Sequence, residues 1–101
     1  MSNFPTYAID LKLVDTFIEV LRLKGVSVEK TEDMYVAAQG SHYKQFEALF
    51  ENGARLVFWI NIYPAKDEIL LNIGNPSGRS GKAPLQSAFQ ILNGLGRRLG
   101  Q

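Results

Sequence analysis

The side chains that could support catalysis are few and scattered along the chain. His42 is the only histidine, and there is no cysteine. A lone histidine makes neither a metal site nor a catalytic triad without partners. Two acid pairs, Asp15 with Glu19 and Glu47 with Glu51, are spaced four residues apart, which is typical of the solvated side of a helix. We therefore expect no enzyme activity, no metal and no cofactor.

A glycine- and serine-rich segment, residues 74–82, is the first candidate for binding. It carries Arg79 and Lys82 and precedes a predicted helix, whose N-terminal N–H groups can hold an anion. The Walker A pattern is not met, because Pro76 stands where it needs glycine and Ala83 where it needs serine or threonine. Nucleotide hydrolysis is excluded on this basis. A solvated connection and a contact to phosphate or nucleic acid both remain open.

The C-terminal quarter of the chain is basic. The first 74 residues carry ten acids and seven Lys or Arg, whereas the rest carries four Lys or Arg and no acid. Arg97 and Arg98 lie in the last turns of the final predicted helix, where cations also favour the helix dipole. With Arg79 and Lys82 they would form a basic patch if the loop and the helix end converge. The pI is about 8.0, below the value above ~9 typical of nucleic-acid-binding domains.

The composition indicates one globular domain over residues 1–101. Hydrophobic residues make up 46% of the chain and charged residues 21%, which is ordinary for a folded protein and excludes extended disorder. No apolar run approaches the ~18 residues that a membrane-spanning helix needs. Residues 1–6 lack the basic and apolar regions of a signal peptide. We expect a cytoplasmic protein that does not contact a membrane.

Hydrophobic periodicity predicts seven elements in the order α-β-β-α-β-β-α. Three helices are predicted, over residues 10–24, between Ser41 and Asn52, and from Pro84 to the end. Four strands are predicted, and they form two hairpins: 26–30 with 34–38, and 54–63 with 68–73. In the second hairpin, pairing of Tyr63 with Glu68 brings Phe58, Ile60 and Leu71 onto one apolar face. The predicted fold is a single α+β domain with a four-stranded, mainly antiparallel sheet and helices packed on it.

Three helices are one more than this sheet needs on one face. Four strands give a width of about 19 Å, which two helices of ~10 Å diameter already cover. The third helix is left to cover the other face or to contact a second molecule. The element order is similar to that of type III secretion chaperones, small dimeric proteins that bind other proteins and usually have an additional strand. This resemblance implies a chaperone-like adaptor.

The second sheet face is the other candidate for binding. Strand alternation places five residues on it: Tyr35, Trp59, Asn61, Tyr63 and Asn72. Aromatic side chains mixed with amides are common at interfaces. Three interpretations of this face remain open. The third helix covers it, or it forms an interface with a second copy or another protein, or its aromatic side chains stack on nucleic-acid bases. We expect a small non-enzymatic protein-binding domain, a regulator, inhibitor or adaptor, that forms a homodimer or binds another protein; nucleic-acid or phosphate binding is the alternative.

Overall fold

The first predicted helix is confirmed in the computed structural model, which describes residues 6–51, 53–64, 66–74 and 82–99. Helix α1 spans Leu11–Leu23, and the Asp10 carboxylate caps it by accepting a hydrogen bond from the Lys12 N–H at 2.9 Å. Gly25 follows with a φ of 86°, a left-handed conformation that glycine adopts without strain. Cap, apolar stripe and terminating glycine thus act together as the sequence predicts.

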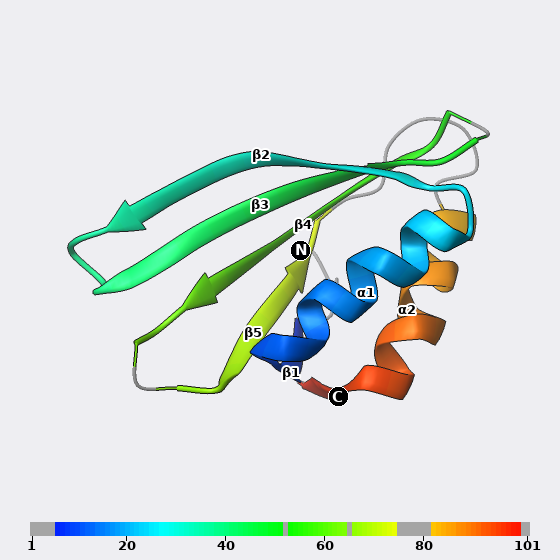
Figure 1. The fold of residues 1–101 in the computed structure, drawn as a ribbon. Coiled ribbons are helices and arrows are strands. Elements are labelled where there is room, and N and C mark those ends of the chain that lie inside the picture. The colour runs from blue at the N-terminus through cyan, green and yellow to red at the C-terminus, as the bar shows by residue number, and fades with distance from the viewer. Residues whose placement is uncertain (1–5, 52, 65, 75–81, 100–101) are drawn as a thin grey trace.

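The remaining elements form an α+β fold of two helices and a six-stranded antiparallel sheet (Figure 1). The strands and the second helix are β1 Thr6–Asp10, β2 Ser27–Val36, β3 Ser41–Leu49, β4 Arg55–Ile62, β5 Glu68–Ile73, α2 Lys82–Leu95 and β6 Gly96–Leu99. The strand order across the sheet is β2-β3-β4-β5-β1-β6. The N-terminal strand therefore lies between two strands from the second half of the chain.

The predicted hairpin of β4 and β5 is confirmed, including its register. Phe58 pairs with Ile73, and Ile60 pairs with Leu71. Phe58, Ile60 and Leu71 are 0%, 2% and 0% exposed, as the alternation of apolar residues predicts. These side chains form the centre of the core.

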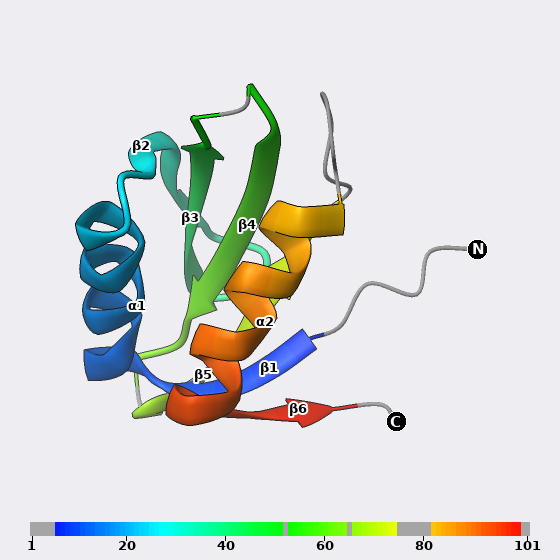
Figure 2. The same ribbon diagram turned by 90° about the vertical axis from the view of Figure 1, so that its right-hand side faces the viewer.

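Both helices lie on the same face of the sheet (Figure 2). From α1, the Phe17 ring packs edge-on against Phe58 with a centroid distance of 5.1 Å. On the same face, the Tyr7 hydroxyl of β1 donates a hydrogen bond to Asn93 Oδ1 of α2 at 3.3 Å, and its ring lies 6.1 Å from Phe89. The helices also contact each other, and β2 and β3 extend beyond them (Figure 1).

The helix predicted between Ser41 and Asn52 is wrong, because this segment forms strand β3. Its apolar residues at helical spacing are divided between the two sides of a strand: Phe46 faces the helices, whereas Tyr43 and Leu49 face away. Pairing along the whole of β4 overrides the helix propensity of the segment. The described residues thus hold two helices, and the expected surplus helix is not among them.

The first predicted hairpin is also wrong. The polar residues Thr31, Glu32 and Asp33 were expected to form its turn, but β2 runs through them as an edge strand. The chain turns later, at residues 37–40, where Gly40 has a φ of 64° and its N–H donates to the Val36 carbonyl at 2.9 Å. A bulge between Lys30 and Glu32 takes up the extra residue.

Two further strands replace predicted coil and helix. β1 precedes α1, and β6 takes over from α2 at Gly96, where the final helix was expected to continue. A Cβ at Gly96 would lie 2.7 Å from the Ala8 carbonyl oxygen, so only glycine allows β6 to approach β1 this closely. The sheet has six strands rather than four, and the order that resembled type III secretion chaperones is not the observed one.

Candidate functional site

The sheet face that points away from α1 and α2, here called the open face, carries a group of large apolar side chains. The strand registers place on it Met34, Tyr43, Leu49, Val57, Trp59 and Leu70, and Tyr63 follows at the end of β4. Met34 and Leu70 are 48% and 47% exposed, and Tyr63 is 38% exposed. No helix among the described residues covers this group (Figure 2).

Trp59 lies near the middle of the open face. It stands between two amides, with Gln45 opposite it on β3 and Asn72 opposite it on β5. The indole lies against Gly74, since a Cβ there would come within 3.1 Å of the ring. The Gly74 N–H donates to the Val57 carbonyl at 2.7 Å and so holds this backbone beside the ring. Trp59 is therefore half-buried and supported from one side.

The polar groups around Trp59 are held by hydrogen bonds. The Thr6 hydroxyl donates to Asn72 Oδ1 at 2.9 Å, and the Tyr43 hydroxyl donates to Gln45 Oε1 at 2.6 Å. Burial, and secondly the charge of Glu32, raise the pKa of Tyr43. The two hydrogen bonds fix the amides beside the indole.

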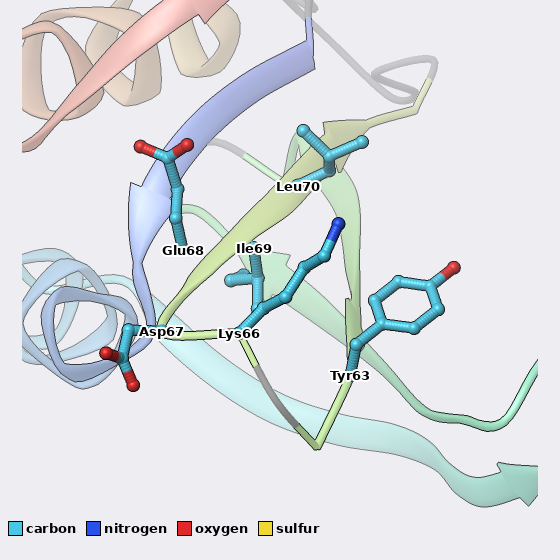
Figure 3. Close-up of a pocket in the computed structure, with 6 residues that line it drawn as sticks. All are labelled: Tyr63, Lys66, Asp67, Glu68, Ile69 and Leu70. Carbon is cyan, nitrogen blue, oxygen red and sulfur yellow. The ribbon is translucent and has the colours of Figure 1, made fainter.

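A hollow of about 420 Å³ opens beside Tyr63 and Leu70, at the turn between β4 and β5 (Figure 3). Lys66, Asp67 and Glu68 line its charged part. Apolar and charged side chains together line this recess.

The structure brings together four of the five residues predicted for the second sheet face. Trp59, Asn61 and Asn72 lie on paired strands of the open face, and Tyr63 follows at its border. Tyr35 does not join them, because the bulge at Thr31 reverses the alternation of β2 from there on.

Beyond the bulge, the side chains of β2 point to the opposite faces of the sheet from those expected. Met34 and Val36 face the open side, and Tyr35, 63% exposed, lies on the helix side opposite His42. Tyr43 was not predicted for the open face, because its segment was predicted to be a helix. The apolar residues of β3 lie on both faces of the strand, so no alternation marks Tyr43 in the sequence.

His42 belongs to a surface cluster on the helix side of β2 and β3. Asp33 accepts a hydrogen bond from Lys30 Nζ at 2.5 Å and pairs with His42 Nε2. The bond from Lys30, and after it the bond from His42, lower the pKa of Asp33 to about 2. Within the described parts of the chain, no three acid or histidine side chains are arranged to hold a metal.

Of the four cations predicted to form a basic patch, the two whose side chains the structure describes, Arg97 and Arg98, are not brought together. Arg97 and Arg98 are neighbours in a strand and point to opposite faces. Arg97 pairs with Glu68 at 3.5 Å on the open face, whereas the Arg98 guanidinium lies 5.4 Å above the Phe89 ring on the helix side. Arg79 lies outside the described residues, and of Lys82 only the backbone is described, at the start of α2.

A second hollow, of about 250 Å³, lies on the helix side between the start of α1 and strands β3 and β4. Phe46, Ile60 and Ile62 form its apolar wall, and Asp15 and Lys44 stand at its sides. It is smaller than the first hollow and separated from it by the sheet.

The chain was compared with family models, with curated proteins and with solved structures, and none of them matches it. Over the residues that the structure describes, neither helix is long and apolar enough to cross a membrane. The open face and its recess are thus the features on which a functional conclusion can be built.

Proposed function

We propose that this protein is a small non-enzymatic protein-binding domain whose contact surface is the open face of its sheet. The observation that carries the proposal is the set of large apolar side chains around Trp59 that no described helix covers. A sheet face that is exposed only to water normally carries polar residues. An apolar face with amides at its centre is typical of a surface that becomes buried in a complex.

Trp59 is the expected anchor of this contact. Large aromatic side chains near the centre of an interface contribute most of its binding free energy. The Gly74 backbone restricts the indole before binding, so less conformational entropy is lost when a partner covers it. The recess beside Tyr63 and Leu70 offers a place for a side chain of the partner.

A protein partner suits the open face better than a nucleic acid. Nucleic-acid surfaces need several cations on one side to neutralise phosphates. Here Arg97 and Arg98 point to opposite faces, and Arg97 is already paired with Glu68. The partner is a second copy of the chain, which makes a homodimer, or a different protein.

The test compares matched substitutions on and off the open face. Leu70→Glu places a charge beside the recess, and Leu23→Glu places the same charge on α1, where Leu23 is 80% exposed. Each purified variant is analysed by sedimentation. Each variant is also used as bait to capture proteins from an extract of its native host cells. A captured protein is then purified separately, and its affinity for each variant is measured by calorimetry.

We expect Leu70→Glu to abolish self-association or capture and Leu23→Glu to preserve it. Trp59→Ala should weaken the same association by about 2 kcal/mol or more, which is roughly 30-fold in Kd, with a smaller effect on the thermal melt. Equal behaviour of Leu70→Glu and Leu23→Glu would contradict the proposal. So would a monomeric wild type that captures nothing and is simply unfolded by Trp59→Ala.

A further inference from the structure

The charges on the open face are predominantly negative. Its strands carry five acids and two arginines, namely Asp10, Glu29, Glu32, Glu47, Glu68, Arg55 and Arg97. Asp10 is already used as the cap of α1. Each arginine is already paired, Arg55 with Glu47 at 3.9 Å and Arg97 with Glu68 at 3.5 Å. Among the described side chains, Glu29 and Glu32 on β2 are left without a cation.

One of these acids directly faces another acid. Glu29 pairs with Glu47 across β2 and β3, and both side chains point to the open face. Like charges opposite each other in an antiparallel sheet are destabilising. Arg55 relieves this repulsion at Glu47 only, so Glu29 is an unfavourable choice for the free protein. A cation supplied by a partner would turn the repulsion into an attraction.

The acids lie next to the apolar centre rather than apart from it. Glu32, Gln45 and Trp59 follow one another on three adjacent strands. Two strand spacings separate Glu32 from Trp59, which is about 10 Å. A polypeptide spans this distance with three residues when extended, or with two helical turns. One short segment can therefore contact the indole and reach both acids.

We infer that the occupant of the open face is a cationic segment of another protein, which places an apolar side chain on Trp59 and Lys or Arg side chains on Glu29 and Glu32. This inference rests on the proposed function and adds the chemistry of the partner. Charge complementarity selects this occupant, because a second copy of the chain brings no surplus of cations on the same face. Anionic lipids and nucleic acids are repelled by the same glutamates.

The experiment uses the fact that Trp59 is the only tryptophan of the chain. Its fluorescence reports on the open face when the protein is titrated with peptides that lack tryptophan. Two 14-residue amphipathic peptides share the same leucines, one with lysine and one with glutamate at all polar positions. We expect the Leu–Lys peptide to shift the emission and the Leu–Glu peptide to leave it unchanged.

Matched variants locate the charges that select the peptide. Glu29→Gln combined with Glu32→Gln should weaken Leu–Lys binding at least about threefold at low salt, on the order of two exposed ion pairs. Glu19→Gln combined with Glu51→Gln removes the same charge from outside the strands and should leave the affinity unchanged. Glu29→Gln alone should raise the urea midpoint of the free protein while it weakens peptide binding, which a purely structural residue would not do.

The outcomes separate this inference from the proposed function. No binding of the Leu–Lys peptide, or equal loss in both double variants, overturns the cationic partner. Equal binding of both peptides that Leu70→Glu abolishes also overturns it, but leaves the open face as a docking surface. If Leu70→Glu and Leu23→Glu bind and capture alike, both proposals fail.

Discussion

The burial of Phe58 gives the strongest quantitative prediction of the fold. The side chain is 0% exposed, and its ring lies 5.1 Å from Phe17 and 5.2 Å from Phe46 by centroid distance. Truncation of a buried phenylalanine to alanine costs about 3–5 kcal/mol. Two ring pairs are lost as well, each worth about 0.5–1.5 kcal/mol. We therefore expect Phe58→Ala to fall in the upper half of the range, at about 4–5 kcal/mol.

The assay is urea unfolding followed by circular dichroism. With a slope of about 2 kcal/mol per molar urea, the midpoint should fall by roughly 2 M. The melting temperature should fall by at least about 15 °C, since 1 kcal/mol corresponds to about 4–8 °C in a domain of this size. Tyr35→Ala is the matched control, because this aromatic side chain on the same side of the sheet is 63% exposed. It should change stability by about 0.5 kcal/mol or less.

A loss below about 1 kcal/mol for Phe58→Ala, or a loss equal to that of Tyr35→Ala, would show that the faces of β4 are inverted. Phe58→Leu keeps most of the apolar volume and should cost about 1–2 kcal/mol. This milder variant remains measurable if Phe58→Ala does not fold at all.

Four further predictions concern two glycines, the pKa of one carboxyl group and the bulge in β2. Gly96→Ala should destabilise the protein by about 1–3 kcal/mol, because the new Cβ would lie 2.7 Å from the Ala8 carbonyl oxygen. Gly94→Ala in α2, where a Cβ meets nothing within 4 Å, should be stabilising by up to about 1 kcal/mol in the same melts. The pKa of Asp33 should be about 2 by NMR titration, below its ordinary value of 3.8. The stability that the Asp33 carboxylate contributes is therefore present above pH 3.8 and is lost as the pH falls to about 2. A titration midpoint near 3.8 would disprove the contact with Lys30. Deletion of Thr31 removes the bulge and joins Lys30 to Glu32 in unbroken alternation, so Tyr35 should stay opposite His42 on the helix side; NOE contacts between the Tyr35 and Tyr43 rings would refute this register.

The sequence predicts the β4–β5 hairpin and α1 because each presents one simple period. Leu56, Phe58 and Ile60 alternate strictly with less apolar residues, and the turn after Tyr63 contains proline. This fixes the register, and with it the position of Trp59 opposite Asn72. The helix has both of its terminal signals at Asp10 and Gly25.

Strands β2 and β3 were not predicted correctly, each for its own physical reason. β3 carries apolar side chains on both faces, Phe46 on one and Tyr43 on the other, so its pattern imitates that of a helix. β2 contains a bulge, which depends on pairing with β3 and leaves no mark in the sequence itself. Where both faces of a strand are partly apolar, alternation stops being informative.

The residues of the candidate site were predicted correctly on β4 and β5 but not on β2 and β3. Trp59, Asn61 and Asn72 follow directly from the β4–β5 register. Tyr35 was assigned to the wrong face because of the bulge, and Tyr43 was not considered because β3 was predicted as a helix. The part of the open face on β4 and β5, including Tyr63 at its border, was thus predicted, and the part on β2 and β3 was missed.

The position of β1 between β5 and β6 has a consequence for how the chain acquires its structure. The strand made first has no neighbour in the sheet until Glu68–Ile73 has been synthesised, and its second edge stays unpaired until Gly96–Leu99 follows. Contacts between segments so far apart in sequence slow folding, since a long loop must close before they form. In a nascent chain, Tyr7 and Ile9 therefore lack their final surroundings until both of these segments have been made.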